Sequence, residues 1–525
     1  MKLPTPAEMA ALERQARETY GIEVAALMER AGARTAEVAR FLLHERGGRR
    51  VVILAGKGNN GGDGLVAARH LAGDATPRVL LVAPAAEISG VPATHLQAVR
   101  DLHVSVLEAG ALSTETLDRT LLEADLLVDA MFGTGFRGPA EGLPAVVIEA
   151  ANRSGWPILA VDVPSGADAG TGAVSAPCIR AAATVTMGLP KLGLVQYPAA
   201  AYVGRLFVAD IGFPAALIVE APIQTSLALA SWVDRSLPRR SPDSHKGGFG
   251  RVLVVAGARG FTGAAVLAAR GAIRAGAGLV TVGIPMSLAA VLPASLPEAM
   301  THPLPETPEG TLSERAGEAI LEFAAGVSAL AIGPGLTMHP EVVTLVRRLL
   351  PRLDHPVVVD ADGLNALAGE AARLRDVPGT VIITPHPGEM ARLLGGSVAD
   401  VQRDRVAAAR GAARTLGVIV VLKGARTVVA SPEGHARIIP TGNAAMATGG
   451  MGDVLTGVVA AFLGQRVPPF EAAACAAYLH GLAGDLAAAS RGELGLLAHE
   501  VADEIPRALA RVRAGQVDDG LSIVA

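Results

Sequence analysis

The chain has 525 residues, of which 50% are hydrophobic, 18% are charged and 3% are aromatic, and its formal net charge is −4. This composition is typical of a globular protein with several domains and excludes a disordered chain. The slight negative charge and the scarcity of aromatic side chains give no reason to expect binding to nucleic acid or to an anionic membrane.

Cysteine usage and hydropathy predict a cytoplasmic protein. The two cysteines, Cys178 and Cys475, lie far apart and match neither a disulfide pattern nor a metal-binding spacing. No 18 consecutive residues are all apolar, so no membrane span is expected. Residues 1–9 contain two prolines and a glutamate instead of an apolar run, so no signal peptide is expected.

The N-terminal half opens with two predicted amphipathic helices. Their apolar residues recur at helical spacing: Leu12, Ala16, Val24, Leu27, Met28 and Ala31. A buried strand over 51–55, a glycine-rich loop over 56–64 and a helix over 65–71 follow. This order begins a doubly wound α/β domain, whose ligands bind at the carboxyl ends of the strands. The match to GxGxxG is weak, and no acidic ribose-binding residue follows the next strand at 78–82, so NAD binding for hydride transfer is rejected.

Polar loops follow two of the later strands in this half. The predicted strands cover 125–128, 157–161, 183–187 and 206–209. Because parallel strands end on one edge of a sheet, we expect Asn60, Asp129, Asp162 and Ser165 to converge. Their amide, carboxylate and hydroxyl oxygens suit a hard cation. Either aspartate alone could cap a turn, but their occurrence together with the asparagine–glycine segment favours a site.

These motifs, in this order, resemble the NAD(P)H-hydrate epimerase domain over nearly all of residues 1–215. The resemblance implies that the hydrated dinucleotide binds to Asn59, Asn60, Gly61, Gly62, Asp63, Gly133, Thr134, Gly135, Phe136, Arg137, Gly138, Pro139 and Asp162. It also implies a potassium ion at Asn60, Asp129 and Ser165, with Asp162 as the candidate acid/base. The route of epimerisation cannot be read from the residues. Met187 stands where an aromatic residue is expected, in a strand, where it affects packing more than chemistry.

Residues 215–244 contain Pro222, Pro238 and Pro242 and are predicted to form a linker without a sheet element. The expected domains are therefore 1–215 and 224–525. A second α/β domain begins with a strand over 252–256, a helix over 263–277 and a strand over 279–282.

Four later strands of this half end in polar segments: 332–335, 359–365, 384–389 and 422–425. All should lie on one edge of the sheet. His386, between two prolines, is interpreted as a ligand contact instead of an ordinary surface or core histidine. Lys423, one of only five lysines in the chain, is interpreted as a contact to a nucleotide phosphate instead of a surface residue.

The segment Thr448-Gly449-Gly450-Met451-Gly452-Asp453 runs directly into an apolar helix. Its glycines predict a tight turn that presents backbone N–H groups to an anion. A carboxylate there would repel phosphate, so Asp453 is predicted to take a proton from a hydroxyl that attacks phosphorus. The alternative is that Asp453 only caps the helix.

These features resemble the ribokinase-like NAD(P)H-hydrate dehydratases over most of 245–505. The resemblance implies that the hydrated dinucleotide binds to Ala264, Gly335, His386 and Asp453, and that ADP binds to Lys423, Gly424, Ala425, Arg426, Thr427 and Gly452. It further implies ADP with Mg²⁺ as the phosphoryl donor, although the residues alone do not separate ADP from ATP.

The sequence therefore predicts two tandem αβα domains, the first Rossmann-like and the second ribokinase-like. The implied protein is a bifunctional enzyme that epimerises R- and S-hydrates of NADH and NADPH and dehydrates the S form, releasing AMP and phosphate. The expected partners are these hydrates and ADP, and a homo-oligomer is expected. Two alternatives stay open at this point: a ribokinase-like small-molecule kinase that releases a stable phosphate ester, and a catalytically silent N-terminal binding or oligomerisation module.

Overall fold

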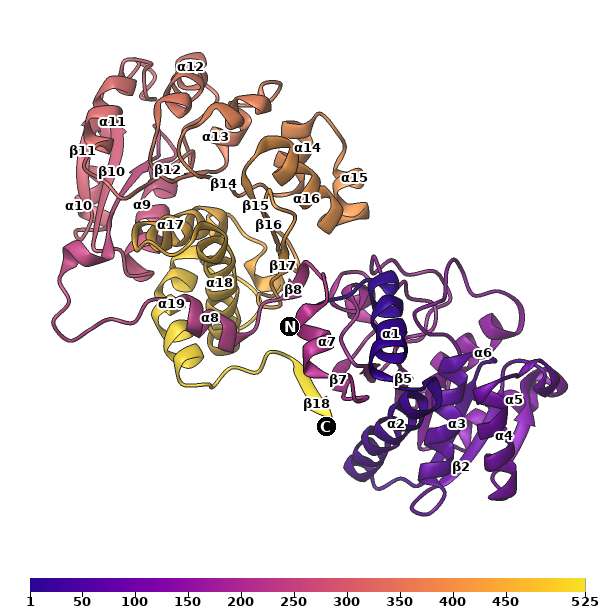
Figure 1. Cartoon of the computed structure of the whole chain (residues 1–525). Coiled ribbons are helices and arrows are strands. Elements are labelled where there is room, and N and C mark those ends of the chain that lie inside the picture. Colours follow the sequence, from indigo (N-terminus) through magenta and orange to yellow (C-terminus); the bar gives the residue numbers. More distant parts are fainter. Residues whose placement is uncertain (525) are drawn as a thin grey trace. The chain divides into compact units, whose positions relative to one another are not determined.

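The computed structural model describes residues 1–524, which fold into two compact α/β units (Figure 1). The first unit comprises Met1–Thr225 together with residues 520–524, and the second comprises Ser226–Asp519. Both units have the α/β architecture expected from the sequence. Among residues 1–524, no helix combines the length and the apolar character that crossing a membrane requires.

The first unit is built on a sheet of eight strands in the order β18-β7-β6-β5-β4-β1-β2-β3, and its neighbouring strands run parallel. The strands are β1 Arg50–Ala55, β2 Thr76–Leu81, β3 Ser105–Glu108, β4 Leu126–Ala130, β5 Ile158–Val161, β6 Ala183–Met187, β7 Arg205–Ala209 and β18 Leu521–Val524. The strand order reverses between β1 and β4. The loops after these two strands therefore diverge and leave a crevice in which sheets of this kind bind ligands.

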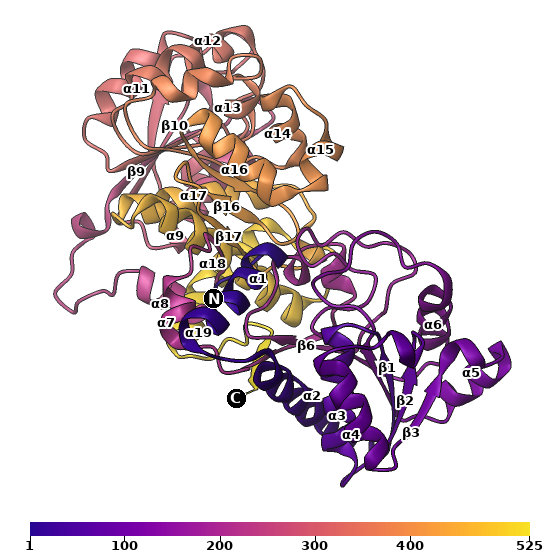
Figure 2. The ribbon, with the colours of Figure 1, turned by 45° about the vertical axis from the view of Figure 1, so that its right-hand side comes forward.

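Helices cover both faces of this sheet (Figure 2). On one face lie α2 Val24–Arg46, α3 Asn59–Leu71 and α4 Val91–Asp101, and on the other lie α5 Thr114–Leu122 and α6 Gly142–Arg153. Each face has its own hydrophobic core: the first core lies between the sheet and α2, α3 and α4, and the second lies between the sheet and α5 and α6. Side chains of a strand alternate between the faces, so Ile53 packs in the first core and Leu54 in the second. The two N-terminal helices predicted from apolar spacing are confirmed as α1 Pro6–Tyr20 and α2.

The predicted start of the third helix was wrong. Helix α3 begins at Asn59, whereas the glycines before residue 65 indicated a loop. These glycines serve close packing: a β-carbon on Gly61 would lie 1.9 Å from the carbonyl oxygen of Gly56, and one on Gly62 would lie 2.6 Å from the sulfur of Met28. Because no side chain intervenes, the first turn of α3 reaches the end of β1 and carries Asn60 to the sheet edge.

The end of the chain belongs to the first sheet, which corrects the predicted boundary of 224–525. Strand β18, the yellow arrow in Figure 1, pairs in parallel with β7 in the register Leu521↔Leu206 to Val524↔Ala209. Val524 is buried in the same core as Phe207. Sequence patterns describe local periodicity and carry no signal for a pairing between residues that lie more than 300 positions apart.

The second unit contains a sheet of ten strands in the order β11-β10-β9-β12-β13-β14-β15-β16-β17-β8. The strands are β8 Thr225–Leu227, β9 Arg251–Val255, β10 Leu279–Pro285, β11 Met300–Leu304, β12 Ala329–Ile332, β13 Val357–Val359, β14 Val381–Ile383, β15 Ile419–Leu422, β16 Val428–Ala430 and β17 Ala436–Ile438. Strands β9 to β15 pair in parallel, and β15, β16 and β17 pair antiparallel. The strand order reverses between β9 and β12.

The segment 215–244 is more than the predicted linker. It contains α7 Ala215–Glu220, the edge strand β8, and α8 Ala230–Ser236. The strand has only three residues and follows Pro222 closely, so its sequence has too few positions to show an alternating pattern. Strand β8 is defined by its pairing with β17 at the edge of the sheet.

Two helices of the second unit approach each other very closely. A β-carbon on Gly271 of α9 Thr262–Arg274 would lie 2.3 Å from the carbonyl oxygen of Val454, which belongs to α17 Met451–Gly464. A β-carbon on Gly457 would lie 1.8 Å from the carbonyl oxygen of Ala268. Helices α18 Pro469–Arg491 and α19 Ala498–Arg513 share the same core. This packing fixes the N-terminus of α17, which carries Asp453.

Candidate active sites

A cavity of about 760 Å³ opens in the first unit beside the ends of β1 and β4. Of the residues predicted to bind the hydrated dinucleotide, it is lined by Asn59, Asn60, Asp63, Gly133, Thr134, Gly135, Phe136, Arg137 and Asp162. Gly61, Gly62, Gly138 and Pro139 are not among its lining residues. Gly61 and Gly62 instead pack against Gly56 and Met28.

The three residues predicted to bind a cation lie together. Ser165 donates from Oγ to Asp129 Oδ1 at 2.7 Å and from its backbone N–H to Asp129 Oδ2 at 2.8 Å. The backbone N–H of Phe132 donates to Ser165 Oγ at 3.1 Å, and Asn60 Nδ2 donates to the carbonyl oxygen of Phe132 at 2.7 Å. Phe132 thus links the asparagine to the serine and the aspartate.

This cluster has the chemistry of a site for a hard cation. Burial raises the pKa of Asp129 to about 6, and hydrogen bonds from Ser165 and Met131 offset only part of that shift. Asn60 Oδ1 is buried, and within residues 1–524 it has no hydrogen-bond partner. A potassium ion would satisfy this amide oxygen and favour the buried carboxylate, so the residues present fit the ion.

Asp162 contacts a buried lysine that motif reasoning did not assign to the site. Asp162 Oδ1 accepts hydrogen bonds from Lys191 Nζ at 2.5 Å, the backbone N–H of Met187 at 3.1 Å and Thr186 Oγ1 at 3.2 Å. Lys191 is 1% exposed. Its only signal in the sequence was the rarity of lysine in this chain.

Two more acids line the cavity near Asp162. Burial raises the pKa of Asp63 well above its ordinary value, the charges of Asp162 and Glu13 add to this, and Lys191 opposes it. Burial also raises the pKa of Glu13, and Lys191 offsets part of that shift. Three carboxyl groups therefore compete for one buried ammonium. Glu13 was missed because it lies on α1, an ordinary amphipathic helix without a motif.

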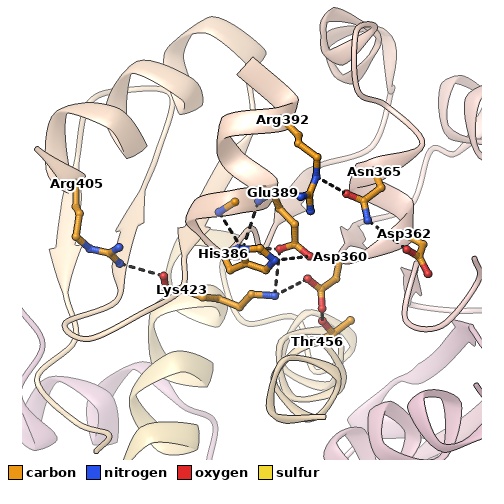
Figure 3. Close-up of polar contacts among 10 residues, drawn as sticks. Asp360, Asp362, Asn365, His386, Glu389, Arg392, Arg405, Lys423 and Thr456 are labelled. Carbon is orange, nitrogen blue, oxygen red and sulfur yellow. Dashed lines mark hydrogen bonds and ion pairs between the residues drawn. The ribbon is translucent and has the colours of Figure 1, made fainter. Parts of the chain in front are cut away.

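In the second unit, a polar network joins the ends of two strands to α17 (Figure 3). Lys423 Nζ lies 2.8 Å from Asp360 Oδ1 and 3.6 Å from Glu389 Oε2. Thr456 Oγ1 donates to Asp360 Oδ2 at 2.7 Å. Burial alone would lower the pKa of Lys423, but Asp360 and Glu389 outweigh it and the net shift is upward. The ammonium predicted to contact phosphate is thus held between two carboxylates.

Asp453 lies in the first turn of α17 without capping it. The N-cap is Gly450, which has a φ of +88°, and no side chain accepts a capping hydrogen bond there. Burial raises the pKa of Asp453 to about 7, with Asp360 adding to the shift and Lys423 opposing it. A carboxyl group with a pKa near neutrality can both take and return a proton under physiological conditions.

The segment predicted to bind nucleotide, 423–427, forms a turn after β15. Thr427 Oγ1 donates to the carbonyl oxygen of Gly424 at 3.0 Å, and Arg426 Nη1 donates to that of Pro440 at 2.8 Å. Ala425 lies within the same turn, and Gly452 faces Lys423 from α17.

Arg405 supports this turn and was missed by motif reasoning. It begins α16 Arg405–Leu416, and its Nη2 donates to the carbonyl oxygens of Leu422 at 3.0 Å and Lys423 at 3.1 Å. Burial lowers the pKa of its guanidinium to about 10. Its position on a helix far along the sequence from any glycine motif gave no signal.

The residues predicted to hold the hydrate fall into two groups. A β-carbon on Gly335 would lie 2.9 Å from the β-carbon of Ala264, so these residues are neighbours after β12 and β9, where the strand order reverses. His386 begins α14 Pro387–Leu394 as its N-cap: Nδ1 accepts from the backbone N–H of Gly388 at 2.9 Å. The imidazole therefore has a capping role, while its side chain is 51% exposed and open to a ligand.

Each unit thus carries buried acids at the carboxyl ends of parallel strands, next to glycine-rich backbone: Asp129 and Asp162 in the first unit and Asp360 in the second. This arrangement defines an enzyme with two sites for nucleotide-like molecules. The family described as NAD(P)H-hydrate dehydratase matches residues 252–507, and the family described as YjeF-related protein N-terminus matches residues 24–193.

Relatives match the chain over nearly its whole length. The bifunctional NAD(P)H-hydrate repair enzyme Nnr of Moorella thermoacetica is 49% identical over 512 residues, covering 97% of each chain. The enzyme of the same name from Thermofilum pendens is 41% identical over 516 residues, covering 98% of this chain and 97% of its own. The chain belongs to the family of bifunctional NAD(P)H-hydrate repair enzymes.

One similar solved structure is the ADP/ATP-dependent NAD(P)H-hydrate dehydratase of Bacillus subtilis, co-crystallised with ATP and Mg²⁺. It is 36% identical, covers 55% of this chain and 98% of its own, and has a TM-score of 0.47. The family predicted from the sequence is confirmed, and so is the prediction of two α/β domains. Neither a simple kinase nor a silent N-terminal module is favoured, because both halves match repair enzymes.

Proposed function

We propose that the first unit interconverts the R- and S-hydrates of NADH and NADPH with Asp162 as acid/base, and that the second unit dehydrates the S form with Asp453 as base and ADP as phosphoryl donor. The observation that carries the proposal is the Asp453 carboxyl: it has a pKa raised to about 7 and lies on the first turn of α17, near the Lys423 ammonium. Both units are needed, because a stereospecific dehydratase alone would leave the R form unrepaired.

In the second unit, Asp453 takes the proton of the hydrate's hydroxyl, and the oxygen attacks the terminal phosphorus of ADP. The bond between this phosphorus and the oxygen that bridges it to AMP breaks. AMP departs, and the hydrate carries a phosphate ester. The phosphate then leaves with the electrons of its bond to carbon. The neighbouring ring carbon loses a proton to the departing phosphate, and the nicotinamide double bond returns.

The second site fits Mg²⁺ bound with ADP. The carboxyl groups of Asp360, Asp362 and Glu389 all act on Asp453, while Lys423 supplies the one positive charge in that set. Such an excess of hard oxygen donors suits a divalent cation, which would neutralise charge on the transferred phosphoryl group. Asp362, whose carboxyl group also acts on Asp453, is the residue we assign to hold it.

In the first unit, we assign the potassium ion to Asn60, Asp129 and Ser165. The buried, unpartnered Asn60 Oδ1 supports this assignment. The ion would supply positive charge near the ends of β1 and β4, where it would orient the dinucleotide. The two buried, unpaired cysteines accord with a cytoplasmic location, which we also propose. The homo-oligomeric state remains a prediction that light scattering can check.

One experiment tests the whole proposal. Purified protein receives a mixture of R- and S-hydrates with ADP, or separately with ATP, and recovery of absorbance at the reduced-nicotinamide band is followed. Complete conversion is expected for the parent protein, and conversion of only the S form is expected for Asp162→Asn. A phosphate ester that accumulates without recovery of this absorbance would instead identify a kinase.

A further inference from the structure

We propose that Lys191 is a positioning residue for epimerisation: its ammonium holds one oxygen of Asp162 so that the other oxygen, Oδ2, faces the cavity as the atom that exchanges the proton. The inference rests on the proposed function, in which Asp162 is the acid/base of the first unit. It adds a specific role for a residue that lies outside every motif of the sequence.

Lys191 lines the cavity together with Asp162, but its hydrogen bonds are all made within the protein. An ammonium has three N–H donors. Lys191 Nζ directs them to Asp162 Oδ1 at 2.5 Å, the carbonyl oxygen of Met187 at 2.7 Å and Thr186 Oγ1 at 3.1 Å. All three donors are used within the protein, and the side chain is 1% exposed. Lys191 therefore acts through Asp162.

The two oxygens of Asp162 have different surroundings. Oδ1 accepts from Lys191, from the backbone N–H of Met187 and from Thr186 Oγ1. Within residues 1–524, Oδ2 accepts no hydrogen bond, although Asp162 lines the cavity. The lone pairs of Oδ1 are thus occupied by three donors, so proton exchange with a bound molecule falls to Oδ2.

The backbone keeps this orientation. Asp162 has a φ of +67°, in the left-handed region that residues other than glycine seldom adopt. Its backbone N–H donates to the carbonyl oxygen of Val185 at 2.7 Å, next to the strand residues that bind its side chain. Both the main chain and the side chain of Asp162 are therefore tied to β6 and the turn after it, which leaves one carboxylate oxygen for chemistry.

The charges around Asp162 give Lys191 an electrostatic role as well. Three titratable groups act on this carboxyl group: Lys191 after β6, Glu13 from α1 and Asp63 from α3. Two of them are acids, so Lys191 is the one group of the three that favours the ionised, proton-accepting form of Asp162. Without the Lys191 ammonium, Asp162 would face two acids and no opposing charge.

The test compares Lys191→Met with Lys191→Arg, which keeps the positive charge. Exchange between R- and S-hydrates is measured without nucleotide, so that the second unit cannot consume the S form. We expect Lys191→Met to slow exchange at neutral pH by about tenfold and to move the acid limb of the pH–rate profile to higher pH, because an ammonium beside the carboxylate is lost. Lys191→Arg is expected to keep the parent position of that limb.

The outcomes separate this inference from the proposed function. Should Asp162→Asn exchange the epimers at the parent rate, the proposed function of the first unit is wrong. Should Asp162→Asn be inactive while Lys191→Met keeps the parent profile, only the role of Lys191 is overturned. If Lys191→Met loses its cooperative melting transition, Thr186→Val replaces it: a lower kcat with the parent KM supports the positioning network, and an unchanged kcat overturns it.

Discussion

Gly452 lies directly against Lys423: a β-carbon built at position 452 would lie 3.1 Å from Lys423 Nζ. The glycine thus leaves room for an ammonium at the N-terminal end of α17, although the helix dipole disfavours a cation there. Asp360 and Glu389 hold the ammonium there. Gly452 and Lys423 are 29 positions apart in the sequence, yet they are in contact in the proposed dehydratase site.

Replacing Gly452 by alanine should therefore displace Lys423. We expect Gly452→Ala to weaken nucleotide binding and slow dehydration by about tenfold, because a shift of a few tenths of an ångström disturbs an aligned charge. Steady-state kinetics with varied ADP measure this. The matched control is Gly411→Ala on α16, where a β-carbon meets nothing within 4 Å; equal effects of both changes would contradict the explanation.

The rate of dehydration should follow the ionisation of Asp453. Its pKa is raised to about 7, so below that pH the carboxyl is protonated and cannot take the hydroxyl proton. We expect the rate to fall about tenfold per pH unit below about pH 7 and to level off above it. Asp453→Asn should abolish dehydration and leave epimer exchange intact, as chiral separation of the hydrates would show. Parent-like turnover by this variant would disprove the role of Asp453.

Thr456 should stabilise the second unit through Asp360. Its hydroxyl donates to a carboxylate that is 1% exposed, at 2.7 Å. Thr456→Val keeps the shape but leaves that oxygen without its donor, so we expect a loss of about 1–3 kcal/mol in the free energy of unfolding by urea. Thr344→Val is the control, because its hydroxyl bonds an exposed carbonyl oxygen of the same helix. A change within the error of that control would remove Thr456 from the network.

Potassium should activate epimerisation in a pH-dependent manner. Binding of the ion needs the ionised form of Asp129, whose pKa is raised to about 6 by burial. Below about pH 6, protons compete with the ion, so the potassium concentration for half-activation should rise about tenfold per pH unit. Potassium should also raise the melting temperature of the parent but not that of Asp129→Asn. Identical behaviour in sodium and potassium would argue against this ion.

Removing residues 520–525 should weaken the first unit selectively. Strand β18 covers the edge of β7, and Val524 is buried in the first core. We expect epimerisation to become more heat-labile while dehydration keeps its thermal profile, because the second unit, Ser226–Asp519, retains all its strands. Separate activity assays after heating at increasing temperatures test this. Equal losses of both activities would show that the strand has no selective effect.

Local hydrophobic periodicity and residue chemistry predicted several elements and part of the first site correctly. The predicted strand over 183–187 coincides with β6, and apolar spacing located α1 and α2. The convergence of Asn60, Asp129 and Ser165 also followed, because strands that alternate with helices run parallel and end on one edge. The glycines of α3 were misread because a glycine in a turn and a glycine at a close helix contact look alike in sequence.

The amino-acid sequence by itself determined the two α/β units, the family and the polar strand ends at which chemistry takes place, since these depend on local periodicity and on residue types at fixed spacing. Only the tertiary structure decided which charges meet, Lys191 with Asp162 and Lys423 with Asp360, and that β18 pairs with β7. Such pairs are set by packing between elements that are distant along the chain. Burial then fixes their electrostatics, and burial is a property of the folded whole.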